Sequence, residues 1–152
     1  MPFPDYYYLA ALIPLFWVGI CLLISHLSGW RTLGARYPLS GEFRGRRWYC
    51  QSVSMRYWMG YNNCITVGAH HEGLYLAVLF LFRPGHPPLF IPWRDVSVIE
   101  KRIFFRRVSE LRFSRSPSIP VRMSFRLFGR MVKHSAGAIQ CCGFDPALPT
   151  SR

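Results

Sequence analysis

The sequence predicts one N-terminal transmembrane helix followed by a mainly-β domain, a partly open barrel of about seven strands with a C-terminal helix. Three observations predict it. One long segment near the N-terminus carries no charge, short apolar runs separated by turn residues follow it, and residues 121–127 alternate between apolar and polar types. The 12 Gly and 12 Pro favour many turns, and therefore short strands.

The transmembrane prediction rests on the 25 residues from Tyr6 to Trp30, which contain no Asp, Glu, Lys or Arg. A spanning helix needs about 20 such residues. Tyr6 and its neighbours at one end and Trp30 at the other are expected at the two headgroup levels. A cleaved signal peptide is the alternative, but Asp5 stands where a base is usual and no Ala-x-Ala site follows. We therefore expect residues 1–30 to anchor the chain.

The distribution of charge predicts the orientation of that anchor. All 19 Lys and Arg residues follow Trp30, and the net charge is +12. The positive-inside rule then predicts a single-pass protein of the inner (cytoplasmic) membrane, with the N-terminus outside and the C-terminal domain in the cytoplasm. Five Cys without a regular spacing also suit a reducing compartment. So basic a chain indicates an acidic partner: anionic lipid, an acidic protein or nucleic acid.

Four segments are expected along the chain. Residues 1–30 are the anchor, 31–46 a juxtamembrane helix and linker, 47–137 the β domain, and 138–152 a disordered tail. Pro38 is expected to stop the juxtamembrane helix, and the linker would hold the domain close to the bilayer.

Within the domain the sequence predicts seven strands, two turns, a tight Pro-rich loop at 84–88, a Ser/Pro loop and a helix. The expected strands are 48–58, 64–69, 74–82, 89–93, 96–105, 108–114 and 121–127, with turns at 60–63 and 70–73, a Ser/Pro loop at 115–120 and a helix at 128–135. The apolar run 74–82 is too short for a second span and suits a buried strand.

Certain residues carry a resemblance to a known family. Gly73–Leu76, the Pro-rich hairpin after it and Ile91–Val96 resemble bacterial pleckstrin-homology-like domains, and Gly29–Leu33 with Tyr37-Pro38 resembles bacterial single-span membrane proteins of this type. The resemblance covers residues 29–135 and implies a barrel capped by a C-terminal helix, with no catalytic residues. Phosphoinositide-binding members carry bases in the first hairpin loop; here the expected loop, Met59–Asn63, has none.

Basic residues are the main candidates for a binding surface. Arg102, Arg106 and Arg107 surround one turn, and Arg122 and Arg126, four apart on the expected last strand, would share a face. Near anionic lipid each is worth about 1 kcal/mol, which makes these five an anionic-surface contact. The alternative is a solvated strand face. Nucleic acid would need the same charges with stacking on aromatic side chains (Tyr57, Trp58 and Tyr61), and a membrane tether makes that partner less expected.

Histidines offer the most tempting candidate metal site. His70, His71 and Glu72 are adjacent, and His86 follows on a nearby loop. Neighbouring residues on a strand point to opposite faces, so the first two would converge only in a turn. We predict no metal or other cofactor and, because no nucleophile-base-acid set stands out, no catalytic residues. Cys141-Cys142 is either a pair of ordinary thiols or an acylation site.

Together these observations favour a non-enzymatic, membrane-anchored interaction module. It would bind a protein partner or the anionic membrane surface on the cytoplasmic side of the lipid bilayer. The alternative is a small membrane-bound enzyme or metal-binding protein that uses the His70/His71/His86 region.

Overall fold

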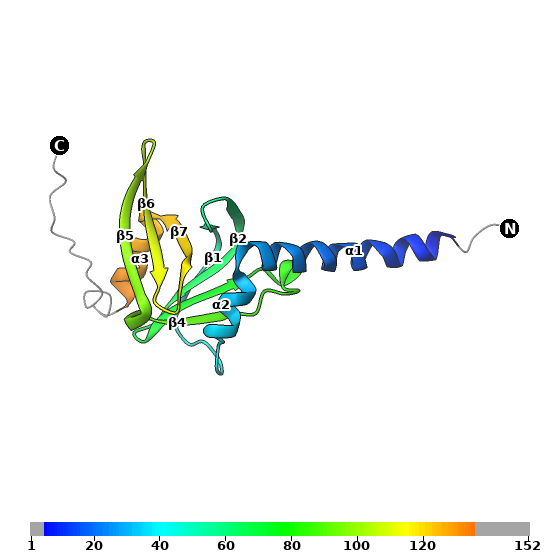
Figure 1. Cartoon of the computed structure of the whole chain (residues 1–152). Coiled ribbons are helices and arrows are strands. Elements are labelled where there is room, and N and C mark those ends of the chain that lie inside the picture. Colours follow the sequence, from blue (N-terminus) through cyan, green and yellow to red (C-terminus); the bar gives the residue numbers. More distant parts are fainter. Residues whose placement is uncertain (1–4, 136–152) are drawn as a thin grey trace.

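The computed structural model describes residues 5–135 and contains the predicted elements in the predicted order (Figure 1). Helices α1 and α2 precede seven strands, and helix α3 follows them. Their bounds are α1 Asp5–Ser28, α2 Trp30–Arg36, β1 Arg46–Met55, β2 Met59–Ala69, β3 Gly73–Val78, β4 Leu89–Pro92, β5 Val96–Ile103, β6 Arg106–Phe113, β7 Ser116–Ser124 and α3 Phe125–His134, with 3-10 turns η1 Phe80–Phe82 and η2 Trp93–Asp95. The predicted fold class, an apolar helix before a β domain closed by a helix, is confirmed.

The seven strands form one antiparallel sheet in the order β4-β3-β2-β1-β7-β6-β5. Two meanders, β1–β4 and β5–β7, meet where β1 pairs with β7 through Val53↔Met123 to Met55↔Val121. Strands β4 and β5 follow each other in the chain through η2 but lie at opposite edges of the sheet. The sheet is therefore curled into a half-barrel that is not closed by hydrogen bonds.

The curled sheet surrounds the main core, and the helices before and after the strands contribute to it. Apolar side chains that alternate along the strands, such as Ile65, Leu76 and Leu111, are fully buried there. Helix α3 adds Phe128 and Met131 to the same core. Full burial of a side chain of this size stabilises the fold by roughly 1.5–3 kcal/mol, so the sheet and the helix depend on each other.

Helix α2 is part of the core, which corrects the prediction that Trp30 lies at the headgroup level. Trp30 and Leu33 are fully buried, and Trp30 Nε1 donates to the carbonyl of Pro87 over 2.8 Å. The chain turns between α1 and α2 at Gly29, whose φ of 82° is left-handed. A Cβ there would lie 2.7 Å from Ile119 Cδ1. The helix expected after residue 30 exists as α2, but it packs into the core inside the curled sheet.

The boundaries of the first three strands differ from the predictions at the first hairpin and at the end of β3. The first hairpin turns at Arg56–Trp58 and not at 60–63, with left-handed φ angles of 49° at Arg56 and 69° at Tyr57. The first hairpin loop therefore does carry a base. Strand β3 ends at Val78, and the rest of the apolar run forms η1.

Two later boundaries also move. Strand β7 begins at Ser116, so most of the expected Ser/Pro loop is strand. Helix α3 begins at Phe125 because Ser124 caps it: the Leu127 N–H donates to Ser124 Oγ over 3.2 Å. The expected tail 138–152, with Cys141 and Cys142, lies outside the described residues.

Helix α1 projects from the domain (Figure 1) and is, among residues 5–135, the one helix long and apolar enough to cross a membrane. Its apolar stretch is Tyr6–Ser28, with a mean hydropathy of 2.3. The N-terminal half is exposed on every side. In the C-terminal half Cys21, Ser25 and Ser28 are buried against the domain. Their spacing of three to four residues puts them on one face of the helix.

Candidate interaction surface on the β5–β6 hairpin

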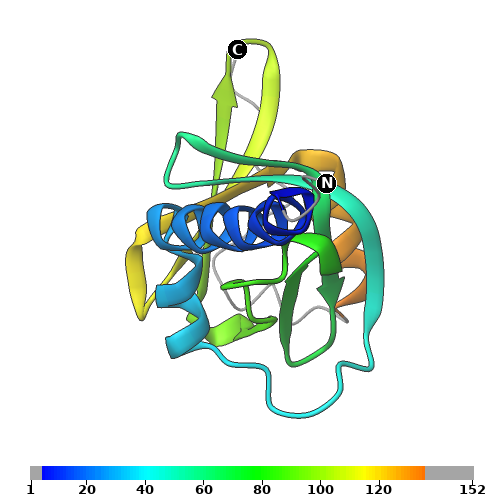
Figure 2. The ribbon, with the colours of Figure 1, turned by 90° about the vertical axis from the view of Figure 1, so that its right-hand side faces the viewer.

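The hairpin of β5 and β6 extends beyond the rest of the sheet. Its last strand pair is Ile103↔Arg106, whereas β7 begins to pair with β6 only at Val108↔Ser124. The end of the hairpin is therefore a two-stranded ribbon without a further neighbour. Both views show it projecting across the direction of α1 (Figures 1 and 2), and Figure 1 shows it at the end of the domain away from the free end of that helix.

Two phenylalanines form the turn of this hairpin. Phe104 is 92% exposed and Phe105 is 91% exposed. Phe104 also has a left-handed φ of 54°, which is uncommon for a bulky residue. Large apolar side chains so fully in contact with water are expected where a partner covers them.

Three bases flank the two phenylalanines. Arg102, Arg106 and Arg107 are exposed, and Arg102 stands directly opposite Arg107 across the ribbon. Like charges that face each other across two strands are destabilising. Within residues 5–135 none of the three forms an ion pair, and the Arg107 guanidinium lies 6.0 Å from the centroid of Phe125. We call residues Arg102–Arg107 the hairpin tip.

A groove of about 630 Å³ runs between the hairpin tip and the first hairpin. Its walls include Phe104 and Arg107 on one side, and Ser52 and Tyr57 on the other. Met123 and Arg122 lie in the same lining. The groove thus combines apolar surface with positive charge, which suits a segment that is both apolar and acidic.

A buried carboxylate organises the bases beside this groove. Glu110 is fully buried and accepts hydrogen bonds of 3.0 Å each from Lys101, Arg112 and Arg122. Burial alone would raise the pKa of the Glu110 carboxyl, but these hydrogen bonds outweigh it and lower the pKa to about 2. The Arg122 guanidinium also lies 4.1 Å from the centre of the Tyr57 ring. It is therefore fixed in place, and Glu110 offsets part of its charge.

Four of the five predicted basic residues lie at the hairpin tip or along the groove beside it. Arg102, Arg106 and Arg107 do gather at the hairpin tip, and Arg122 lies on the groove wall. The expectation that Arg126 shares a strand face with Arg122 is wrong, because the strand ends at the Ser124 cap and Arg126 belongs to α3. The sequence reasoning missed Phe104 and Phe105. The signal was present as two adjacent aromatic residues between bases.

The aromatic set proposed for nucleic-acid stacking is not assembled. Tyr61 is 6% exposed, and its hydroxyl lies 2.8 Å from Ser28 Oγ and 2.9 Å from His86 Nε2. Burial raises the pKa of Tyr61 to about 12. The Arg122 guanidinium lies over the Tyr57 ring. Of the three aromatic residues, Trp58 therefore remains as the exposed ring that could stack on a base.

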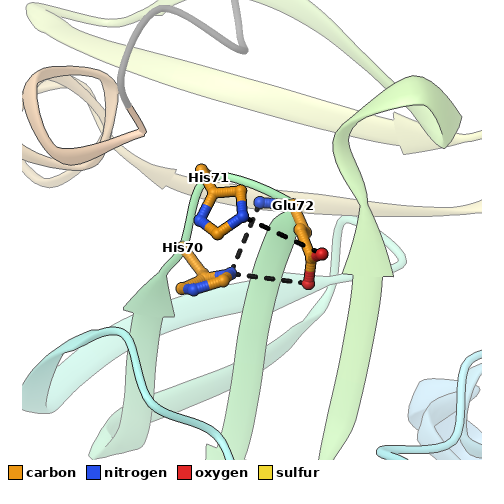
Figure 3. A group of neighbouring side chains, drawn as sticks. All are labelled: His70, His71 and Glu72. Carbon is orange, nitrogen blue, oxygen red and sulfur yellow. Dashed lines mark hydrogen bonds and ion pairs between the residues drawn. The ribbon is translucent and has the colours of Figure 1, made fainter.

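The histidine cluster divides into two separate places. His70, His71 and Glu72 form the turn between β2 and β3, so their side chains do converge, with all ligand atoms within 4.8 Å of one another (Figure 3). His70 Nδ1 lies 3.7 Å from the Glu72 carboxylate and His71 Nε2 lies 3.8 Å from it. His86 instead is buried against Tyr61, and burial lowers its pKa. Its Nδ1, 3.0 Å from the Pro84 carbonyl, is therefore the protonated nitrogen.

Fold and surface together define a class: a half-barrel domain on a helix that can span a membrane, with a basic aromatic hairpin at the far end. Comparisons with protein-family models, with curated proteins and with solved structures found no significant match. The pleckstrin-homology-like resemblance stays a prediction.

Proposed function

We propose that this protein is a non-enzymatic, membrane-anchored interaction module whose hairpin tip binds an acidic partner protein at the cytoplasmic face of a membrane. The observation that carries the proposal is the pair Phe104 and Phe105, 92% and 91% exposed between three bases. Apolar anchors ringed by charge are typical of protein-binding surfaces. The groove beside the tip offers space for a segment of the partner.

A protein partner suits the tip better than the bilayer surface does. If α1 crosses the membrane, the bilayer lies on the side of the domain from which α1 projects. The hairpin lies at the opposite end and points across α1 (Figure 1). Exposed charges interact over only about 10 Å at 0.1 M salt, so bases held away from the bilayer gain little from anionic lipid.

The proposed orientation rests on the bases that follow α1. Arg31 and Arg36 lie on the exposed side of α2, directly after the apolar helix. Bases so close to the end of a span favour the cytoplasmic side. The domain would then be cytoplasmic and the N-terminus outside.

Photo-crosslinking tests the proposal in the membranes of cells that make the full chain. A photoreactive phenylalanine analogue at position 104 should yield a discrete protein adduct. The double substitution Arg106→Glu and Arg107→Glu should abolish that adduct. Arg94→Glu, an exposed base at the other end of β5, is the matched control and should leave it unchanged. Adducts with lipid alone, or an adduct that ignores the charge reversal, would contradict a protein partner.

A second candidate function is metal binding at the β2–β3 turn, favoured by the convergence of His70, His71 and Glu72. Two imidazoles and a carboxylate form a ligand set that zinc accepts. Zinc titration of the full chain in neutral nanodiscs should then show one site that His70→Ala with His71→Ala removes and His134→Ala does not. Equal binding by both variants would rule out this turn as the site.

A further inference from the structure

A second exposed apolar group lies on the other side of the molecule, next to α1. The η1 segment, here Leu79 together with the 3-10 turn η1 (Phe80–Phe82), follows β3 and exposes Leu79, Phe80 and Leu81 by 43%, 75% and 51%. No base or acid interrupts it, and Arg83 follows at once. In Figure 1 the short η1 turn lies alongside α1, well away from the hairpin tip.

The η1 segment and the loop after it contact α1 along about two turns of that helix. Trp17 Nε1 donates to the carbonyl of Leu81 over 3.0 Å, and the Trp17 and Phe82 rings are 5.3 Å apart. Further along, Ser25 Oγ donates to the carbonyl of Gly85, where a Cβ would lie 2.9 Å from Leu22 Cδ2. Segment and helix are therefore packed together from Trp17 to Ser25.

The length of α1 decides where this contact lies relative to a bilayer. Before Trp17 the described helix has only about 12 residues, or roughly 18 Å at 1.5 Å per residue. The hydrocarbon core of a bilayer is about 30 Å thick. If α1 spans it, the bilayer must continue past Trp17 toward the C-terminal end of the helix. The η1 segment, bonded to Trp17, then lies within the hydrocarbon.

Most backbone polar groups of the segment have partners within the protein. Each unpaired backbone N–H or C=O group costs several kcal/mol in hydrocarbon, so a non-helical segment there needs partners within the protein for its polar groups. The Leu79 N–H donates to the Cys64 carbonyl over 2.7 Å, and the Phe82 N–H donates to the Leu79 carbonyl over 2.9 Å. The Arg83 N–H bonds to the Phe80 carbonyl, and Trp17 covers the carbonyl of Leu81.

We infer that the η1 segment is a membrane-inserted wedge, whose Leu79, Phe80 and Leu81 side chains contact lipid acyl chains beside α1. The inference rests on the proposed function in one respect, because it requires α1 to span the bilayer. Exposed Arg83 stands at the end of the wedge and reaches the headgroups with its long side chain. The domain thus contacts the membrane through two elements, which fixes its tilt and leaves the hairpin tip in water.

An environment-sensitive fluorescent amino acid tests this in the full chain in proteoliposomes. It would replace one residue at a time: Phe80 in the wedge, Phe104 in the hairpin tip, or Ile13 in α1. All three side chains are at least 70% exposed, so the substitutions leave the packing intact. Quenching by acyl-chain-brominated phospholipid and by aqueous iodide is then compared. At positions 80 and 13 we expect brominated lipid to quench severalfold more than iodide does, and the reverse at 104.

Two contrary outcomes have different meanings. If position 13 is quenched by lipid but position 80 by iodide, α1 spans the bilayer and the wedge is refuted. If position 13 is itself quenched by iodide, the anchor fails and the proposed function fails with it. Circular dichroism matching the unlabelled chain confirms that each labelled variant is folded.

Discussion

The η1 segment and the hairpin tip expose the same kind of side chain to opposite surroundings. Phe80 is 75% exposed in one and Phe104 is 92% exposed in the other. The η1 segment has no charge until Arg83, its carbonyl at Leu81 is bonded to Trp17 of α1, and it follows an apolar strand. The hairpin tip has three bases and stands remote from α1 (Figures 1 and 2).

Exposure alone therefore does not identify a binding surface. An exposed apolar group beside a spanning helix is already in its preferred solvent, which is lipid. An equally exposed group among arginines and away from that helix remains in water until a partner covers it. The proposed wedge and the hairpin tip are thus distinguished by their distance from α1, not by how exposed their side chains are.

The largest expected effect on stability comes from Trp30, whose packing fixes α1 and α2 relative to the domain. Trp30 is fully buried and bonded to Pro87, which belongs to the loop after the η1 segment. We expect Trp30→Ala to lower the free energy of unfolding by about 3–5 kcal/mol, because it leaves a large cavity and an unpaired carbonyl. Denaturant unfolding of the full chain in nanodiscs would measure it. Arg31→Ala, on the exposed neighbour, is the control and should cost under about 0.5 kcal/mol.

An acidic substitution should distinguish the two exposed phenylalanines next. Phe80→Asp would place a carboxylate in the hydrocarbon, which costs about 2.5–3.5 kcal/mol at the centre of a bilayer and somewhat less nearer its surface. Phe104→Asp would place the same group in water beside three arginines and should change stability by under about 0.5 kcal/mol. Unfolding midpoints of the two variants in nanodiscs give the comparison. Equal midpoints would mean that both positions face the same solvent.

A smaller effect is expected from the buried carboxylate at the base of the hairpin. The folded pKa of Glu110, about 2, is below its ordinary value of 4.5. The contribution of ionised Glu110 to the free energy of unfolding is therefore complete well above pH 4.5, and it is lost as the pH falls through 4.5 toward 2. Because Lys101 and Arg112 are themselves partly exposed, we expect a loss of about 1–2 kcal/mol over that range.

The Glu110→Gln variant provides the check on that carboxylate. Denaturant unfolding between pH 7 and pH 2 should show a difference between wild type and variant that narrows with acid. A constant difference across the range would show that the Glu110 charge does not contribute.

Regular alternation made most of the sheet predictable from the sequence. The run Val121–Met123 with its polar neighbours could only bury one face, and β7 contains it. The sequence pattern did not predict the structure where an apolar residue could face either the protein core or an apolar environment outside it. The run 74–82 reads as one buried strand, yet β3 ends at Val78 and Phe80 points out of the core, while Phe82 packs against it from η1. Composition does not separate a protein interior from lipid.

Other features depended on contacts between distant parts of the chain. Trp30 stands at the end of an apolar run, as an interfacial residue would, and only its contact with Pro87 and Tyr61 places it in the core. The Arg56–Trp58 turn has no glycine to mark it. Three of the predicted bases lie together at the hairpin tip, because residues on either side of a hairpin turn are close in space. Arg122 could not be known to share Glu110 with Lys101 until the register of β5–β7 was fixed.

Paramagnetic relaxation in the unaltered full chain, reconstituted in nanodiscs, tests most directly whether the two exposed regions lie in different solvents. The broadening of each amide signal would be measured in two samples, one with a nitroxide attached to lipid acyl chains and one with a gadolinium chelate dissolved in water. We predict that the nitroxide broadens Leu79–Phe82 as strongly as the exposed half of α1, while the chelate broadens Phe104 and Phe105. Broadening of Leu79–Phe82 by the chelate, with α1 protected from it, would contradict the account.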